Sequence, residues 1–543
     1  MSKEIEEFID SLKSWEKNYA IQDYDCDKYD CEVATICKAQ KEKDMNTLVN
    51  FWNEKLDNKY FELRHPIYND VLTRAVYSIQ KGRTNVVFFI DKDNKHPWAI
   101  FQVGHLIDGC AVQGKILKIF SYWNYYFLDS KSLSLDEKNL RYKDIEAAFA
   151  LHNDAPQHYV KDVLYAFYVL YKHKLKIKNV SPSNCFFMPS FAQKVEDNKE
   201  YVYIYPNMCN NFKYFKDYQE FMLADSLKYK NFYNTKDLSY DLILWLGLPA
   251  AAYRTWLEKL QGCALILKEF SKYFKKIRVY VDGNTAYEGQ RADFPENKKT
   301  FKELVRQTRQ IFSNGGGHLG SCDTKIYDID EDEKNAVKDE AYIAFKSLAG
   351  YDYRTKICYC NDCDIVISEG NTTGIVPRIS QKATILFIPP DITWAAKFSK
   401  HLVSQIQLAG SGDKSKGMNN YHIPPQHIYN LAAEVLEELS KEDKLKIKNL
   451  KMHRLFVPEV ELVKRQYDLA KALACDLPLL DENNIEYFKK IGEYFLNKEN
   501  EVENKNKELQ TLKTQIQNLN SNILSLQNEN KSLKENFLFP HAE

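Results

Sequence analysis

The residues best suited to bind a charged ligand lie in one turn, Glu369–Gly374, with the sequence EGNTTG. The turn follows a short apolar run, Asp364–Ser368, and precedes a helical segment that ends near Ser380. A second apolar run, Ala383–Ile388, comes next, so the pattern predicts a strand, a turn, a helix and a strand. In such a unit the turn opens a helix, where unpaired N–H groups and the helix dipole favour an anion.

The composition of this turn suits a phosphate group. Gly370 and Gly374 allow the backbone to approach a ligand closely. Asn371, Thr372 and Thr373 offer polar side chains that cap a helix or contact phosphate. A turn that only caps its own helix would have the same composition, and one glycine-rich turn is weak support for a ligand site. The surrounding elements must decide between these two interpretations.

A second strand–loop–helix–strand pattern places Arg254 in a comparable position. The apolar strand Asp241–Leu248 leads through a loop to a long helix, and the next strand ends at Asp282 and Gly283. Arg254 stands where the loop enters the helix, and a guanidinium group there matches phosphate geometry. The alternative is an arginine on a first helical turn, paired with Glu258. Asp282 and Gly283 end their strand at the edge where α/β sheets bind ligands.

Two histidines are candidates for a general base. His158 lies one helical turn before Asp162, so the carboxylate can orient the imidazole; the alternative is a helix whose polar residues face solvent. His105 is expected to end a strand, where a cleft forms in α/β domains. A histidine that is only hydrogen-bonded within its loop fits the sequence equally well.

The sequence also contains residue types that bind metals. Asp91 and Asp93 form a DxD pair after an apolar strand, as in metal-dependent transferases of the GT-A type. A second strand follows at once, which favours an ordinary hairpin turn. Two cysteine groups lack the matching second pair of a zinc site, so we expect buried thiols and no metal. These groups are Cys26, Cys31 and Cys37, and Cys358, Cys360 and Cys363.

Length and composition limit the protein class. A chain of 543 residues is too long for one ordinary core, so two or three domains are expected. Hydrophobic residues make up 44% and charged residues 28%, which is typical of a globular protein. Lys+Arg and Asp+Glu are equal at 75 each, so we expect no nucleic-acid partner. The charged amphipathic start does not resemble a signal sequence, and we expect a cytoplasmic protein.

Changes in pattern divide the chain into five parts. Residues 1–58 are expected to form a helical appendage, and residues 59–237 a first α/β domain. Residues 238–410 alternate strands and helices, which predicts a parallel, doubly wound sheet. Within this part, residues 330–350 read as a helix with an acidic first turn. A linker with helices is expected over 411–497, and a coiled coil over 498–538.

The C-terminal heptads are a strong structural signal. Asn530 falls at an a position, which sets register and favours parallel dimers, so we expect a homodimer through residues 498–538. A solvated single helix is the alternative. The apolar residues at heptad spacing are Val502, Leu509, Leu512, Ile516, Leu519, Ile523, Leu526, Leu533 and Phe537.

The order of these motifs resembles the nucleotide-sugar domain of GT-B glycosyltransferases, in particular bacterial surface-polysaccharide and heptosyltransferase-like members. The resemblance covers about a third of the chain, and its motifs are individually of low specificity. The residues that carry it are Arg254, Thr255 and Trp256, the VYVDG segment 279–283, the CDIVISEGNTTG segment 363–374 and the QKATILFIP segment 381–389.

The resemblance implies a GT-B-like pair of Rossmann-like domains that uses a nucleotide sugar as co-substrate, without a further cofactor or a catalytic metal. It implies a donor diphosphate held by Arg254 and the Glu369–Gly374 turn, near Thr255, Asp282 and Gly283. A bacterial surface glycan, such as capsule or lipooligosaccharide, is the implied acceptor, with peripheral contact at the inner membrane. His158 is the first choice for the catalytic base and His105 the second.

Two other functions remain open from the sequence. The chain is a non-catalytic interaction protein if its sugar-nucleotide-like domain is degenerate and the coiled coil recruits partners. It is a metal-dependent GT-A transferase if Asp91 and Asp93 hold a cation.

Overall fold

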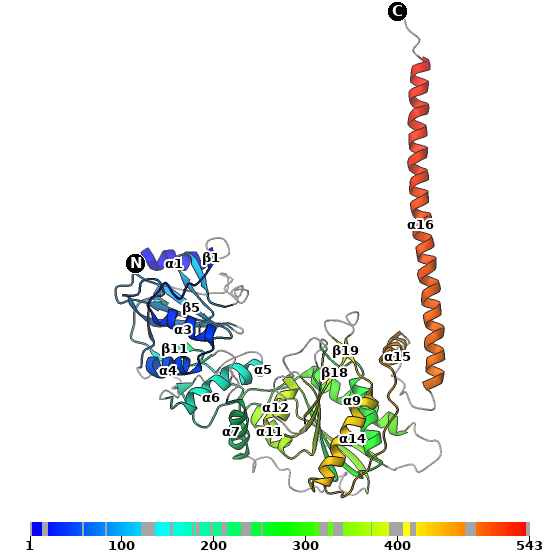
Figure 1. The fold of residues 1–543 in the computed structure, drawn as a ribbon, viewed down its shortest axis with the longest axis horizontal. Helices are drawn as coiled ribbons and strands as arrows, with labels where there is room; N and C mark the ends of the chain where they lie inside the picture. Colours follow the sequence, from blue (N-terminus) through cyan, green and yellow to red (C-terminus); the bar gives the residue numbers. More distant parts are fainter. Residues whose placement is uncertain are drawn as a thin grey trace, which may run out of the picture.

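The computed structural model shows two α/β lobes and one long isolated helix (Figure 1). We call residues 3–207 the N-terminal lobe and residues 240–472 the C-terminal lobe, with helix α7 (Phe215–Leu227) between them. The described residues are 3–538 apart from 14–19, 57–58, 82–83, 121–134, 136, 152–155, 176–178, 181–184, 196–198, 208–213, 230–239, 251–253, 314–323, 329–339, 371, 390–404, 413–419 and 473–484.

The N-terminal lobe contains a seven-stranded sheet in the order β1-β7-β6-β5-β4-β3-β2 among the described residues. All neighbouring strands run antiparallel except β1 and β7. The strands are β1 (Ala20–Asp23), β2 (Glu62–Arg64), β3 (Leu72–Lys81), β4 (Thr84–Ile90), β5 (Trp98–Gln102), β6 (Gly109–Val112) and β7 (Lys115–Lys118).

This sheet corrects the prediction of a Rossmann-like domain over residues 59–237. Only a few residues separate β3 from β4, β4 from β5 and β6 from β7. A parallel pair needs a crossover connection of a dozen or more residues, so these short connections force antiparallel hairpins. The fold class is therefore mixed α/β, with one Rossmann-like lobe.

Helices cover both faces of the N-terminal sheet. Phe88 and its alternate neighbours on β4 pack against α1 (Lys3–Lys13) in one core cluster. Phe89, on the opposite face, shares a second cluster with Trp52 of α4. Helices α3 (Glu32–Glu42) and α4 (Met45–Leu56) thus pack into the lobe, although residues 1–58 were expected to form an appendage.

A small parallel sheet, in the order β10-β9-β8-β11, completes the N-terminal lobe. A helical segment after β8 carries His158 and passes through one π-helical stretch before α6. The elements are η3 (Glu137–Asn139), β8 (Glu146–Phe149), α5 (Pro156–His158), η4 (Tyr159–Leu164), α6 (Tyr165–Lys172), β9 (Asn179–Val180), β10 (Gln193–Lys194) and β11 (Tyr201–Ile204).

The C-terminal lobe is built on a seven-stranded sheet in the order β14-β15-β13-β12-β16-β17-β18. Every neighbouring pair is parallel, which confirms the predicted doubly wound sheet. Its elements are β12 (Leu242–Gly247), α8 (Lys259–Phe270), β13 (Lys276–Asp282), α9 (Pro295–Ser313), β14 (Lys325–Asp328), β15 (Tyr342–Ser347), α11 (Tyr353–Asn361), β16 (Ile365–Glu369), η6 (Thr372–Gly374), α12 (Ile375–Ile379), β17 (Ala383–Ile388) and β18 (Gln405–Ala409).

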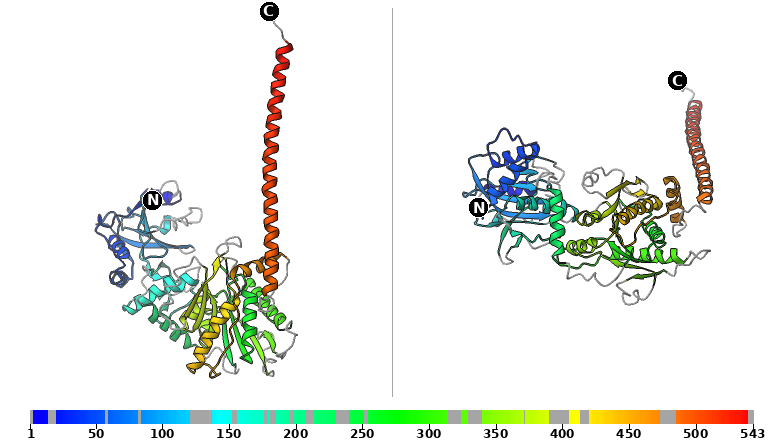
Figure 2. Two further views of the ribbon diagram at one scale, coloured as in Figure 1. Left: turned by 45° about the vertical axis from the view of Figure 1, so that its right-hand side comes forward. Right: turned by 60° about the horizontal axis from the view of Figure 1, so that its bottom comes forward.

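Two groups of helices sandwich this sheet (Figure 2). Leu244 of β12 faces the core formed with α8, α9 and α14 (Pro425–Lys441). Trp245, the next residue, faces the opposite core with α7, α11 and α12. This second core is continuous with that of the N-terminal lobe, so α7, α11 and α12 join the lobes.

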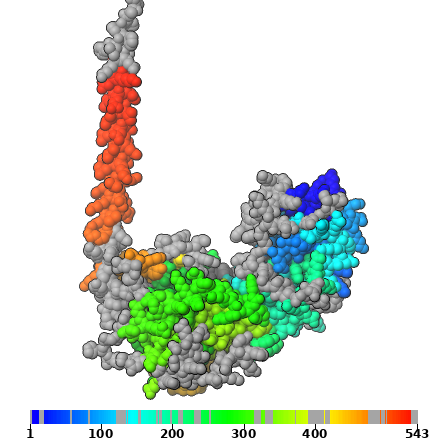
Figure 3. All heavy atoms as spheres, turned by 180° about the vertical axis from the view of Figure 1, so that it is seen from behind, coloured from blue at the N-terminus to red at the C-terminus, as the bar shows by residue number. Residues whose placement is uncertain are grey.

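The remaining described elements follow the parallel sheet. The short strands β19 (Ser411–Gly412) and β20 (Tyr421–His422) pair antiparallel beside it. After α15 (Val460–Ala472), the helix α16 (Ile485–Leu538) extends away from both lobes (Figure 3). Among the described helices, none has an apolar stretch long enough to cross a bilayer.

Candidate functional site

The candidate site lies at the point where the strand order of the parallel sheet reverses. From β12 the chain continues through α8 to β13 on one side, whereas β16 lies on the other side of β12. The segments that follow β12 and β16 therefore leave opposite faces of the sheet, toward α8 and α12 respectively. Open α/β sheets bind ligands in the crevice at the carboxyl ends of such strands.

The two predicted turns meet at this point, at the carboxyl ends of β12 and β16. Thr255 Oγ1 donates a hydrogen bond of 2.9 Å to Glu369 Oε1, and the Trp256 N–H donates to the same oxygen at 3.3 Å. Lys259 Nζ donates to Thr255 Oγ1 at 2.9 Å and to the Pro249 carbonyl at 2.7 Å. The structure thus connects Thr255 and Glu369 directly, although 114 positions separate them in the chain.

Burial sets the charge states in this network. It raises the pKa of the Glu369 carboxyl to about 7, an effect that Lys259, Thr255, Trp256 and Tyr421 oppose. Burial also lowers the pKa of Lys259, and the nearby Glu369 carboxylate opposes that change. Burial thus favours the uncharged form of both side chains, and the attraction between their charges opposes this effect.

Arg254 precedes this network and is exposed. Its φ angle of 54° lies in the left-handed region, which residues other than glycine seldom adopt. This backbone conformation immediately precedes Thr255, so Arg254 is an exposed cationic residue adjacent in the chain to the hydrogen-bonded network. Glu258, the arginine partner of the alternative interpretation, is fully buried and hydrogen-bonds His422.

The Glu369–Gly374 turn is more tightly packed than the sequence suggests. The Gly370 N–H donates to the Phe387 carbonyl at 2.7 Å, and Thr373 Oγ1 donates to the Glu369 carbonyl at 2.9 Å. Thr372 and Gly374 belong to the three-residue helix η6, and the following α12 has only five residues. Its dipole is correspondingly short, so cationic side chains must provide most of the attraction for an anion. Asn371 lies outside the described residues.

Asp282 and Gly283 make contacts with other residues of the C-terminal lobe. Lys356 Nζ, on α11, lies 2.7 Å from Asp282 Oδ1, and both side chains are buried. Burial raises the pKa of Asp282 and lowers that of Lys356, while each charge partly offsets the effect on the other. A Cβ atom on Gly283 would lie 2.3 Å from Asn297 Nδ2, so this glycine permits close packing of α9.

Sequence reasoning missed a buried acid–imidazole pair next to the site. His422 Nδ1 and Glu258 Oε1 are hydrogen-bonded, and both side chains are fully buried. The segment around His422 lies across the start of α8, because Tyr421 exchanges backbone hydrogen bonds with Thr255 and Leu257. The only sequence signal is a Tyr–His dipeptide in a polar, proline-rich segment, which predicts a loop and no contact with α8.

The two predicted base candidates have carboxylate partners. His158 Nδ1 lies 2.7 Å from Asp162 Oδ2, as the spacing predicted, and the imidazole is partly exposed. His105 Nδ1 lies 2.9 Å from Asp108 Oδ1, and its ring stacks on Phe120 with centroids 3.9 Å apart. Asp108 also accepts backbone hydrogen bonds within this loop. His105 therefore fits the alternative, a histidine that is only hydrogen-bonded within its loop, better than His158 does.

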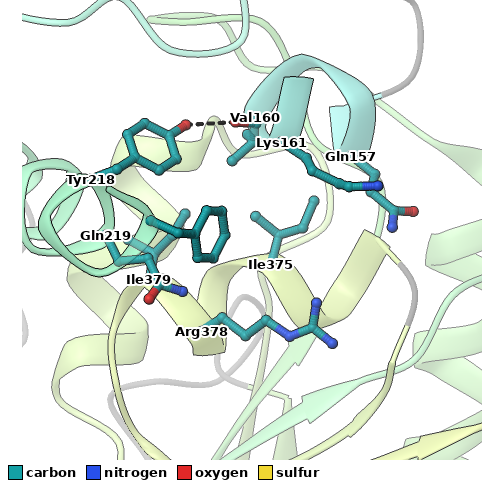
Figure 4. A pocket seen from close by; sticks show the side chains of 9 residues that line it. Gln157, Val160, Lys161, Tyr218, Gln219, Ile375, Arg378 and Ile379 are labelled. Carbon is teal, nitrogen blue, oxygen red and sulfur yellow. Dashed lines mark hydrogen bonds between the residues drawn. The ribbon is translucent and has the colours of Figure 1, made fainter. Parts of the chain in front are cut away.

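A pocket lies where the lobes meet, lined by Gln157, Val160 and Lys161 from the segment that carries His158 and by residues of α7 and α12 (Figure 4). Its floor is apolar, whereas Lys161 and Arg378 contribute two cationic groups and none of its lining residues is acidic. Burial lowers the pKa of Arg378 to about 10. Arg378 lies on α12, which directly follows the Glu369–Gly374 turn in the chain. The lining residues are Gln157, Val160, Lys161, Phe215, Tyr218, Gln219, Ile375, Arg378 and Ile379.

The DxD pair forms a hairpin turn, as the sequence favoured. Asp91 Oδ1 accepts hydrogen bonds of 2.8 Å from the N–H groups of Lys95 and His96, which close the turn between β4 and β5. Over the described residues, no three His, Cys, Asp or Glu side chains are grouped to hold a metal ion. Cys358, Cys360 and Cys363 are buried thiols.

Comparisons with known proteins give distant likenesses in fold. No family model matches the chain, and no curated protein matches its sequence. E. coli ADP-heptose lps heptosyltransferase II is similar at 12% identity and a TM-score of 0.25, over 39% of this chain and 51% of that one. The N-terminal domain of Candida albicans trehalose-6-phosphate phosphatase is similar at 10% identity and a TM-score of 0.21, over 42% and 38%. At these values the likenesses carry no argument about activity.

Proposed function

We propose that the chain is a glycosyltransferase that binds the diphosphate of a nucleotide-sugar donor in the crevice between β12 and β16. The hydrogen bond between Thr255 and Glu369 carries this proposal, because it brings the two predicted turns together where parallel sheets bind ligands. Arg254 and Lys259 place positive charge there, which favours a diphosphate.

In the proposed reaction, a hydroxyl of the acceptor attacks the anomeric carbon of the donor sugar. The bond from this carbon to the diphosphate oxygen breaks, and the nucleoside diphosphate leaves with the bonding electrons. Arg254 and Lys259 stabilise the charge that develops on the leaving group. His158, held by Asp162, accepts the hydroxyl proton. The nucleotide sugar is the co-substrate, and the chemistry requires no further cofactor.

The acceptor is proposed to enter from the pocket between the lobes, which is lined in part by the segment that carries His158. The cationic groups of Lys161 and Arg378, which line this small pocket, suit a phosphate or carboxylate on a glycan. A bacterial surface glycan or its lipid-linked precursor fits this chemistry, with the enzyme at the cytoplasmic face of the inner membrane.

A thermal-shift titration tests donor binding. Nucleoside diphosphates of the common bases should raise the melting temperature, because a ligand that binds only the folded state stabilises it. Arg254→Ala should remove this shift, whereas Arg306→Ala, an exposed arginine on α9, should retain it. The absence of a shift with every nucleoside diphosphate would contradict the proposal.

A second function, a non-catalytic interaction protein, is supported by one observation. The side chains of Glu369, Thr373 and Asp282 are engaged within the protein, as expected of a crevice that no longer binds a ligand. Under this function, no nucleotide should change the melting temperature of wild type or of Arg254→Ala. A nucleotide shift that depends on Arg254 would exclude it.

A further inference from the structure

Helix α16 carries a stripe of large apolar side chains that is exposed to solvent. Eight leucine and isoleucine side chains of the helix, from Leu509 to Leu533, are between 51 and 60% exposed, and all of them except Leu524 lie on this stripe. Apart from a contact with α15, the helix stands clear of both lobes (Figure 3). A continuous apolar surface of this kind marks an interaction site.

We infer that a second copy of the chain covers this stripe, in a parallel, in-register, two-stranded coiled coil. The stripe has a strict seven-residue repeat, which is the period at which two helices supercoil around each other. The a positions are Val502, Leu509, Ile516, Ile523 and Asn530, and the d positions from the second heptad on are Leu512, Leu519, Leu526 and Leu533. The inference does not depend on the proposed transferase activity.

The residue types at these positions select two parallel strands. β-Branched residues at a with leucine at d favour a dimer over higher assemblies, and Ile516 and Ile523 are followed by leucines at every d position. Asn530 interrupts the apolar a positions once. Paired with Asn530 of the partner copy, it satisfies its amide only when the helices are parallel and in register.

The flanking charges identify the partner as the same chain. In a parallel pair, a g residue faces the e residue five positions later on the other helix. This rule sets Glu508 against Lys513 of the partner copy, and Glu529 against Lys534 of the partner copy. An antiparallel pair brings g positions to g positions and e to e, which opposes glutamate to glutamate and lysine to lysine. Self-pairing is therefore complementary in the parallel orientation alone.

Mass measurement of the full chain tests the dimer. Light scattering or sedimentation at micromolar concentration should give twice the mass of the 63.6 kDa chain. Leu519→Glu should weaken association by roughly a hundredfold or more, because it buries a charge in the seam. Leu524→Glu should leave the dimer intact, because Leu524 is equally exposed, at 59%, but lies at a b position.

A wild-type monomer, a trimer or tetramer, or a dimer that survives Leu519→Glu would overturn the inference. Circular dichroism and the melting temperature of the lobes check that both variants fold. If both leucine variants unfold, two measurements still test the dimer: the dissociation of wild type on dilution, and the self-association of the charge variants Glu508→Lys and Lys513→Glu.

Charge reversal tests the parallel orientation. Glu508→Lys and Lys513→Glu should each weaken self-association about three- to tenfold, because each sets like charges against each other across the interface. Mixed together, the two variants should form a heterodimer as stable as the wild-type dimer, because both contacts are then between opposite charges. Equal stability of all three pairings would contradict the parallel, in-register arrangement.

Discussion

At the scale of single residues, Glu369 joins the two turns of the candidate site. Its carboxyl group is fully buried, accepts from Thr255 and Trp256, and lies near the Lys259 ammonium. A buried carboxyl of this kind holds its proton at neutral pH more readily than an exposed one. Its protonation state therefore determines whether the Lys259 ammonium has a charged or an uncharged carboxyl group nearby.

The pH dependence of stability should report on this carboxyl group. Its pKa is raised from 4.5 to about 7 on folding, so the folded state holds a proton that the unfolded state loses between these values. Glu369 therefore lowers the free energy of unfolding as pH rises from about 4.5 to about 7. Glu369→Gln should remove this loss. In urea unfolding, the free energy of unfolding of wild type should therefore fall by roughly 2–3 kcal/mol more than that of the variant between pH 5 and pH 8.

Glu438→Gln, at an exposed position on α14, serves as the control and should leave the pH profile unchanged. Parallel pH profiles for wild type and Glu369→Gln would show that Glu369 is ionised throughout this range.

Two glycines of the crevice should respond differently to substitution. A Cβ atom on Gly247, the last residue of β12, would lie 1.9 Å from Ser368 Oγ and 3.1 Å from Thr373 Cβ. Gly247→Ala should therefore lower the free energy of unfolding by about 1–3 kcal/mol and weaken nucleotide binding. Gly374→Ala should be tolerated, since its Cβ meets only ordinary contacts of 3.4 Å or more. Equal losses in denaturant unfolding would contradict this packing.

At the scale of elements, Arg354 on α11 joins the lobes. Its guanidinium bonds the Glu288 carboxylate at 2.9 Å, the Met188 carbonyl at 2.7 Å and the Asp225 carbonyl at 2.9 Å. It also lies over the Phe187 ring, 4.4 Å from the centroid. These contacts tie α11 to α7 and to the segment before β10, so they fix the parallel sheet relative to the N-terminal lobe.

Arg354→Ala should lower the free energy of unfolding by about 1–3 kcal/mol, because it removes a buried guanidinium that bonds Glu288 and Asp225, and Asp225 keeps the exposed Lys228 as a cationic partner. Arg306→Ala, which removes an exposed ion pair on α9, should change it by less than about 1 kcal/mol. Denaturant titration measures both values. A loss for Arg354→Ala no larger than that for Arg306→Ala would show that the joint contributes little stability.

Elements with a clear period were predictable from the sequence, and elements defined by distant contacts were not. The strands that end at Asp282 and Glu369 were predicted, because apolar runs bounded by turns indicate buried parallel strands. Residues 330–350 were predicted as one helix, yet β15 (Tyr342–Ser347) is a strand between β13 and β14. A short apolar run does not distinguish a buried strand from a buried helix.

The candidate site was predictable to a similar extent. Glu369 was identified because it follows an apolar strand, and Thr255 because it belongs to the Arg–Thr–Trp motif of the resemblance; the fold brings the two residues together. Lys356 and His422 were not identified, because their partners Asp282 and Glu258 lie far away in the chain. Burial and pairing across such distances leave no local pattern in the sequence.

At the scale of the whole molecule, the candidate site and the apolar stripe of α16 are separate. The crevice lies within the C-terminal lobe, whereas α16 extends away from both lobes (Figure 1). Leu519→Glu should therefore abolish dimerisation and leave the nucleotide-dependent rise in melting temperature unchanged. A rise that disappears together with the dimer would show that pairing shapes the crevice.

A crystal structure with a bound nucleoside diphosphate tests the central claim most directly. The account predicts that the diphosphate lies between the ends of β12 and β16, within hydrogen-bonding distance of Arg254 and close to Lys259. Crystals of Arg254→Ala grown with the same ligand should lack it. A diphosphate bound elsewhere on the chain, or crystals that remain free of it at saturating concentration, would contradict the account.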